Sequence, residues 1–171
     1  MNSTDGSQVA PTRAQPAQSA PTAQGNSALT DAQRHMLKEF VGEAAELSEA
    51  LAADNLEGIN KHLAKLPALA RPLPDALAAP HPLNAALKQL AAAKLQTAKD
   101  LADARKQFLP FSTALVDLTK QLRKQDKAFA DLKVYHCPMA PEPGLWIQAK
   151  GPLANPYYGS KMLRCGEEVT R

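Results

Sequence analysis

Apolar side chains recur at three- and four-residue spacing through most of this 171-residue chain, and this periodicity restricts the fold more than any other feature. The first series follows Thr30 and contains Leu37, Phe40, Val41, Ala44, Leu47 and Leu51. Such spacing places apolar residues on one face of an α-helix. Thr30 and Gln33 have the form of a capping box, in which two side chains bind backbone N–H groups reciprocally. The pattern therefore predicts an amphipathic helix from Thr30 to about Ala53.

A second, shorter apolar series follows directly. Asp54 or Asn55 can cap a helix there, and Pro67 is expected to close it because proline cannot donate the hydrogen bond that continues a helix. Five prolines lie between Pro67 and Pro82. We expect this stretch to be a stiff, irregular crossover.

Helical spacing resumes at Leu83 and continues to Phe108, which predicts the longest helix of the chain. Pro110 either kinks that helix or starts a new one, and helical content is expected to end near Phe129. Helices of this kind must bury their apolar faces against one another. We therefore predict an all-α fold, a small antiparallel bundle of three to four helices.

The chain divides into two parts by composition. Residues 1–28 are rich in Pro, Ala, Gln and Ser and are expected to form a disordered linker. Residues 29–171 are expected to form the helical bundle domain, with irregular loops over 134–171. The N-terminus lacks the basic start and the apolar run of a secretion signal.

Charge and hydropathy argue against two classes of partner. The chain has 20 Lys and Arg against 17 Asp and Glu, a net charge of +3, and the signs are interleaved along the predicted helices. A nucleic-acid surface usually shows a basic stripe or block. No stretch approaches the roughly 18 consecutive apolar residues of a membrane span. We expect no nucleic-acid partner and no membrane span.

Two motifs near the C-terminus carry soft metal ligands. His136, Cys137 and Met139 offer an imidazole, a thiol and a thioether within four residues, while Met162 and Cys165 add a second thioether and thiol. Thiolate with thioether favours Cu(I) or Ag(I), whereas a Cys and His set would also suit Zn(II). We predict that turns at each motif bring these five residues into one metal site.

A disulfide between Cys137 and Cys165 is the alternative use of the two cysteines. In that interpretation the methionines are packing residues. Trp146, Tyr157 and Tyr158 are expected to shield the site from water or to cover the open end of the bundle.

We do not expect an enzyme. Cys137 and His136 are adjacent, so their side chains generally point apart, and no C-x-x-C motif is present for thiol oxidoreductase chemistry. The other histidines, His35, His62 and His81, are scattered and are expected to have surface or capping roles.

The C-terminal motifs resemble those of a known family. The runs His136–Ala140, Gly144–Trp146 and Asn155–Gly166 are similar to the HCPMA, G-x-W and NPYxGxxMLxCG signature of a helical domain of unknown function. That domain occurs at the C-terminal end of periplasmic adaptor subunits (membrane fusion proteins) of copper/silver-type heavy-metal efflux pumps, and also as a small exported protein. Two upstream segments, Ala50–Leu56 and Ala104–Ser112, are similar to its helical part.

The resemblance implies a periplasmic location, efflux pump components as partners, and a bound Cu(I) or other soft metal ion. Carried over by position, the ligands would be His136, Cys137, Met139, Met162 and Cys165. The alternative is a structural or interaction domain of an efflux adaptor, with its loops pinned by the Cys137–Cys165 disulfide. One departure is Pro110, which lies in a segment that is usually helical throughout.

Overall fold

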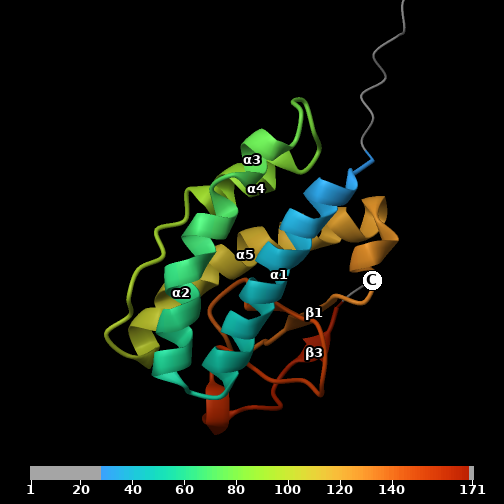
Figure 1. Cartoon of the computed structure of the whole chain (residues 1–171). Coiled ribbons are helices and arrows are strands. Elements are labelled where there is room, and N and C mark those ends of the chain that lie inside the picture. Colours follow the sequence, from blue (N-terminus) through green and yellow to red (C-terminus); the bar gives the residue numbers. More distant parts are fainter. Residues whose placement is uncertain (1–27, 170–171) are drawn as a thin grey trace, which may run out of the picture.

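The computed structural model describes residues 28–169, and within them the helices lie against a small sheet (Figure 1). The helices are α1 (Asp31–Ala52), α2 (Leu56–Ala70), α3 (Leu73–Ala76), α4 (Asn84–Ala91) and α5 (Leu101–Gln125). Single 3-10 turns occupy Lys127–Phe129 and Gly159–Lys161. The strands are β1 (Lys133–His136), β2 (Leu145–Gln148) and β3 (Glu167–Glu168). Apart from its last position, the predicted linker over 1–28 lies outside the described residues.

The start of α1 confirms the predicted capping box. The Thr30 hydroxyl accepts the backbone N–H of Gln33 at 3.2 Å, and the Gln33 side chain accepts the backbone N–H of Thr30 at 2.8 Å. The apolar face of α1 is buried as its spacing indicates, with Leu37, Phe40 and Leu47 fully inside. Local capping and burial of the stripe thus agree on where this helix begins and how it is oriented.

Replacing Thr30 by Ala should lower the free energy of unfolding by about 1 kcal/mol, because the first turn of α1 loses its side-chain acceptor. Urea denaturation of the two proteins would measure this. Thr30→Ser retains the hydroxyl and should stay close to the parent. Equal loss in the Ser and Ala variants would show that the cap is not the cause.

Pro67 and Pro110 lie in the interiors of helices, and the predicted end of the second helix at Pro67 is therefore wrong. α2 continues past Pro67 to Ala70, and α5 runs through Pro110 without a break. An interior proline removes one hydrogen bond. Pro110 itself is exposed, although Phe108 and Phe111 on either side of it in sequence are buried. The carbonyl that loses its donor in α5 can therefore be hydrated. Burial on the other face keeps the helix continuous.

The predicted long helix from Leu83 to Phe108 is also wrong, because α4 ends at Ala91 and an irregular segment over 92–100 precedes α5. Asn60 of α2 holds this segment. Its side chain accepts the backbone N–H of Ala98 at 2.7 Å and donates to the carbonyl of the same residue at 3.0 Å. The expected irregular crossover between the second and third helices contains the short helix α3.

The three strands form an antiparallel sheet in the order β2-β1-β3, so the predicted all-α class is wrong. Aromatic and β-branched residues occupy β1 and β2. Tyr135 of β1 lies opposite Trp146 of β2, with ring centroids 5.4 Å apart. Such cross-strand pairs stabilise a sheet. Within residues 28–169 no strand exceeds four residues, which is too short for alternation to be visible in a segment interrupted by Pro and Gly.

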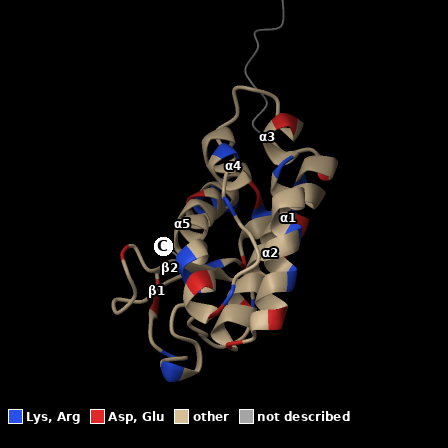
Figure 2. Cartoon of the chain, turned by 90° about the vertical axis from the view of Figure 1, so that its left-hand side faces the viewer, with Lys and Arg blue, Asp and Glu red and all other residues tan. Residues whose placement is uncertain are grey.

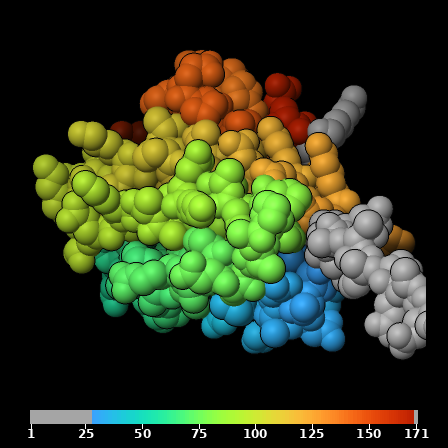
Figure 3. All heavy atoms as spheres, turned by 90° about the horizontal axis from the view of Figure 1, so that it is seen from above, coloured from blue at the N-terminus to red at the C-terminus, as the bar shows by residue number. Residues whose placement is uncertain are grey.

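The sheet packs against α1 and α5. The Ser112 hydroxyl of α5 donates to the carbonyl of Leu145 in β2 at 2.7 Å, and Phe40 of α1 meets Phe111 of α5 edge to face at 6.3 Å. Seen from above, the C-terminal segment (orange to red) lies on the opposite side of the molecule from α1 and α2 (blue to green) (Figure 3). One hydrophobic core therefore joins helices and sheet.

Charge and length complete the description of the helices. Acidic and basic residues are mixed along them rather than gathered on one helix (Figure 2). Within residues 28–169, none of the helices combines the length and the apolar character needed to cross a membrane.

Candidate functional site

The two cysteines, 28 positions apart in sequence, lie side by side. Cys137 Sγ and Cys165 Sγ are 3.6 Å apart, and both thiols are free. Cys137 directly follows β1 and is fully buried, while Cys165 is half-buried and gives the pair its access to solvent. The hydrogen bond with Cys137 and burial both raise the pKa of the Cys165 thiol. The predicted meeting of the two cysteine motifs is therefore present.

Backbone hydrogen bonds, rather than the sulfurs, hold Cys137 in place. Its N–H donates to the carbonyl of Gly144 at 3.0 Å, and its own carbonyl accepts the N–H of Ala140 at 3.2 Å. These bonds close the turn that begins at Pro138. The buried thiol is thus positioned by the hairpin between β1 and β2.

Asn155 holds the other cysteine. Its buried side chain donates to the carbonyl of Cys165 at 2.8 Å and accepts the backbone N–H of Tyr157 at 2.8 Å, and its own N–H donates to the carbonyl of Leu163 at 2.9 Å. A side-chain amide that bonds across a turn fixes the turn's shape. The Asn155 turn therefore returns Cys165 to Cys137.

The sulfur separation restricts what the pair can bind. Bonds of about 2.3 Å to one metal ion place two sulfurs about 3.8 Å apart in tetrahedral, about 4.0 Å in trigonal and about 4.6 Å in linear coordination. A disulfide requires about 2.04 Å. The observed 3.6 Å fits a three- or four-coordinate ion with little movement, and it also leaves the thiols close enough to oxidise.

The other three predicted ligands lie in the same two motifs as the cysteines, each with surroundings of its own. Met139 is 59% exposed, and Met162 is half-buried in the turn before Cys165, whose N–H its carbonyl accepts at 2.9 Å. His136 Nδ1 lies 3.9 Å from Glu167 Oε1 on the adjacent strand. Among the described residues, the one group of three His, Cys, Asp or Glu ligand atoms within 4.8 Å of one another lies on α1 and α2. The structure thus brings together two of the five predicted ligands.

The predicted shielding residues surround the cysteine turns from the core side. Trp146 is fully buried, stacks on Tyr135 and meets Tyr157 edge to face at 6.2 Å. A Cβ on Gly166, at φ +139°, would lie 2.7 Å from the Trp146 ring, so the residue after Cys165 must be glycine. These contacts make Trp146 and Tyr157 part of the core beneath the site.

The tyrosine hydroxyls connect this layer to the backbone around it. Tyr157 donates to the carbonyl of Leu145 at 2.5 Å, and Tyr158 donates to the carbonyl of Met139. Burial raises the pKa of Tyr157, so this phenol remains a hydrogen-bond donor throughout the neutral range. Tyr158 is only half-buried and covers the turn that carries Met139.

Asp54 and Arg105 tie the cysteine-bearing segment to the helices. Arg105 of α5 donates to the carbonyl of Pro156 at 2.9 Å, to that of Leu51 at 3.0 Å and to Asp54 Oδ1 at 2.5 Å. The second oxygen of Asp54 accepts the backbone N–H of Ser160 at 2.9 Å. One buried guanidinium therefore joins α1, α5 and the C-terminal segment.

The approach of Gly159 to this pair leaves no space for a side chain. A Cβ there would lie 2.0 Å from Asp54 Oδ1 and 2.5 Å from an Arg105 nitrogen, and the residue has φ +56°. Asp54 itself has φ +54°, a conformation that Asp and Asn tolerate better than most residues. Three of the five segments quoted for the family resemblance, Ala50–Leu56, Ala104–Ser112 and Asn155–Gly166, meet at this point.

Stability should fall in acid because of Asp54. The hydrogen bonds from Ser160, and then that from Arg105, lower the pKa of its carboxyl from 3.8 to about 2. Because the folded-state pKa lies below the unfolded value, the carboxylate stabilises the fold above pH 3.8 and this contribution is lost as the pH falls toward 2. Between pH 3.8 and 2, the free energy of unfolding should fall by about 2 kcal/mol more in the parent protein than in Asp54→Asn. Urea unfolding of the two proteins in parallel would measure this. Identical pH profiles for the two proteins would contradict it.

Scans of the chain against protein-family models, curated proteins and solved structures find no match. The resemblance to the efflux-adaptor domain therefore rests on the residues quoted for it and stays a prediction.

The turn at Asn155 was expected from the sequence, whereas the side-chain bonds that build the site from a distance were not. Asn155, Asp54 and Arg105 bond to backbone groups elsewhere along the chain, 54 positions apart for Arg105 and Leu51 and 106 positions apart for Asp54 and Ser160. Spacing patterns report only local neighbours. The available signal was the resemblance itself, because all three residues fall in segments quoted for it.

Proposed function

We propose that this protein is a soft-metal binding domain, with Cys137 and Cys165 as the central ligands and Cu(I) or Ag(I) as the ion. The single observation that supports this most directly is the pair of free thiols 3.6 Å apart, each held by backbone hydrogen bonds independent of the sulfurs. A pair positioned in advance loses little conformational entropy on binding an ion. The role proposed is binding rather than catalysis.

A third ligand completes the proposed site. The sulfur separation favours three- or four-coordination over a linear ion, so two thiolates do not suffice. Met162 is the first candidate, because it lies in the same turn as Cys165 and its thioether side chain has three rotatable bonds. Met139 and His136 would have to turn from solvent and from the Glu167 side of the sheet.

The family resemblance supports a cellular context for this proposal. We place the protein in the periplasm, where it would bind the ion and deliver it to heavy-metal efflux components or regulate them. Among the proposed ligands, Met139 is exposed and Cys165 is half-buried, which suits transfer of an ion to a partner. Soft ligands on both proteins would allow direct exchange.

A structural role is the second candidate function, and the same sulfur separation supports it. Oxidation to a Cys137–Cys165 disulfide would close a loop of 28 positions and stabilise the fold by on the order of 3 kcal/mol. Asp54 and Arg105 already pin the same segment to the helices. In this alternative the domain contacts other efflux components without holding a metal.

A Cu(I) competition titration on the reduced protein tests the proposal. With a coloured Cu(I) chelator as competitor, the reduced protein should take one equivalent of Cu(I) from the chelator. Elemental analysis should find less than one equivalent of copper in the oxidised protein. Intact-mass measurement after thiol labelling reports the oxidation state in each sample. A protein that resists mild reductant as isolated, and takes up no Cu(I) once reduced, would establish the structural alternative instead.

A further inference from the structure

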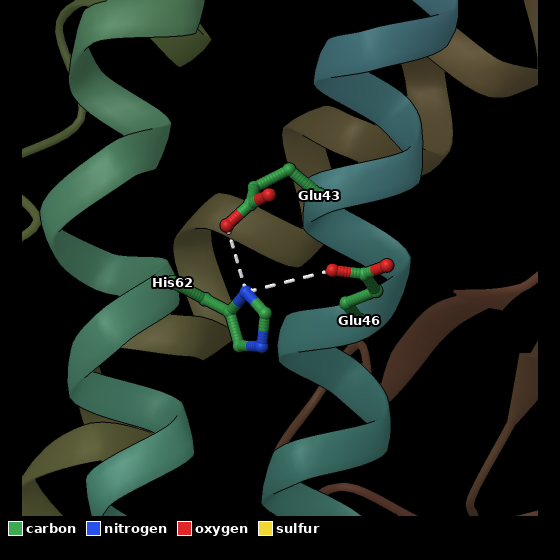
Figure 4. Close-up of side chains that lie close together, drawn as sticks. All are labelled: Glu43, Glu46 and His62. Atoms are coloured by element: carbon green, nitrogen blue, oxygen red, sulfur yellow. Dashed lines mark hydrogen bonds and ion pairs between the residues drawn. The ribbon is translucent and has the colours of Figure 1, made fainter.

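A second group of metal-ligating side chains lies away from the cysteines, between α1 and α2. Glu43 and Glu46 are three positions apart on α1 and so share a face, and His62 of α2 points toward both (Figure 4). His62 Nδ1 lies 2.7 Å from Glu43 Oε1 and 3.9 Å from Glu46 Oε2. Both helices are held in register by the core, so these three groups are positioned by the fold.

The hydrogen bond within this group joins His62 to one of the two carboxylates and leaves the other facing solvent. An imidazole Nδ1 can donate a single proton, and the 2.7 Å contact gives it to Glu43. Glu46, at 3.9 Å, is beyond hydrogen-bond distance and makes no other ion pair within the described residues. Two carboxylates therefore face one ring nitrogen, which is one more carboxylate than a single His–Glu hydrogen bond requires.

Ligand geometry agrees with a small divalent cation. An ion at about 2.05 Å from nitrogen and oxygen ligands in tetrahedral coordination separates them by about 3.3 Å. The two distances from His62 Nδ1, 2.7 and 3.9 Å, lie on either side of that value. Glu46 is 61% exposed and free to close its gap, while His62 and Glu43 are 14% and 11% exposed and hold their positions.

The positive charge of Lys65 lies next to the Glu43, Glu46 and His62 group and competes with a bound cation for Glu43. Lys65 Nζ lies 3.5 Å from Glu43 Oε2, so one positive charge offsets part of the negative charge of the two carboxylates. Lys65 is 51% exposed, which keeps its competition with an ion weak. The two carboxylates still outnumber the one lysine, and the group has an open side through Glu46.

We propose that Glu43, Glu46 and His62 form a binding site for a borderline divalent cation, of which Zn²⁺ is the representative, with water in the fourth position. In the bound form His62 coordinates through Nδ1 as an imidazole with its proton on Nε2, which the proton donated from Nδ1 to Glu43 reaches by exchange with solvent, and one oxygen of each glutamate coordinates the ion. The donor set contains no sulfur, so it selects against Cu(I) and Ag(I). The site is independent of Cys137 and Cys165.

A Zn²⁺ titration by calorimetry on the tag-free full chain with Cys137→Ser and Cys165→Ser tests this site. We expect one Zn²⁺ per chain. His62→Gln and Glu43→Gln should each weaken binding by more than the 10- to 100-fold that loss of a second-shell partner causes. Exposed residues of α1 supply matched controls, and His35→Gln and Glu39→Gln should leave the affinity unchanged.

Two further measurements keep the test decisive if a buried substitution unfolds the chain. Glu46→Gln changes an exposed side chain, so it should retain the circular dichroism of the parent and still weaken Zn²⁺ binding about tenfold. Co²⁺ bound to the wild-type chain should show d–d absorption from this site without a thiolate charge-transfer band when the thiols are alkylated. Absence of Zn²⁺ binding, or binding that Glu46→Gln and His62→Gln leave unchanged, would mean that the group is only a contact between helices.

Discussion

Replacing both Cys137 and Cys165 by serine should weaken Cu(I) binding by the reduced protein by at least about a hundredfold, or about 2.8 kcal/mol of binding free energy. The reason is that the hydroxyl is a hard ligand and Cu(I) prefers thiolate and thioether. Each single variant should lose most of this affinity, because the ion is shared by two sulfurs held 3.6 Å apart. The competition titration described above measures the loss.

Methionine variants serve as graded controls for this result. Met162→Leu should weaken binding by up to about tenfold, since leucine keeps the volume and removes the thioether. Met139→Leu should have a smaller effect because that side chain lies in solvent. If the double cysteine variant binds Cu(I) as tightly as the parent, the two sulfurs are not the ligands.

Truncating Arg105 to alanine should lower the free energy of unfolding by about 3 kcal/mol, and the midpoint of thermal unfolding by about 10 °C. The substitution removes the hydrogen bonds that Arg105 donates to the Asp54 carboxylate and to the carbonyls of Leu51 and Pro156, and the guanidinium is only 19% exposed. Desolvated groups that lose a charged partner carry most of such a penalty. Thermal and urea unfolding of the two proteins would measure it.

Arg105→Lys is the matched control. Lysine keeps the positive charge but lacks the planar set of donors that reaches three acceptors at once, so about half of the lost stability should return. Alkylation of Cys165 should also become faster in Arg105→Ala, because Pro156 and the turn that positions the cysteine lose their attachment to α5. A change in stability below about 0.5 kcal/mol in Arg105→Ala would contradict the role assigned to this residue.

The helix starts that could be predicted are those with a local capping signal. Thr30 caps α1 through bonds to Gln33, three positions away, and the apolar stripe behind it is buried. Asn55 caps α2 in the same way, accepting the N–H of Gly58 at 3.0 Å. Such contacts are fixed by neighbours in sequence, which is why the pattern was sufficient.

Where tertiary contacts override local preference, the sequence prediction failed. Pro67 is expected to end a helix and Pro110 to kink one or start a new one, yet burial of the opposite face keeps α2 and α5 continuous. The sheet was missed because its strands are short and gain their stability from a pairing across the hairpin, Tyr135 with Trp146. Pairings of this kind leave little trace in a single sequence.

Of the two candidate sites, the sequence predicted the one with cysteines and did not predict the one with glutamates and histidine. The two cysteine motifs carry soft ligands, and a turn at Asn155 was expected to return one motif to the other, as the structure has it. The second group, on α1 and α2, was not foreseen. His62 was interpreted as a surface or capping residue, because only the packing of the two helices turns it toward Glu43 and Glu46.

Native mass spectrometry of the reduced wild-type protein with one equivalent of Cu(I), followed by brief alkylation, tests the sulfur site most directly. We expect one copper per chain and protection of both Cys137 and Cys165 from alkylation. This protection should be lost when a strong Cu(I) chelator is added. Alkylation of both cysteines at the same rate with and without Cu(I) would contradict it.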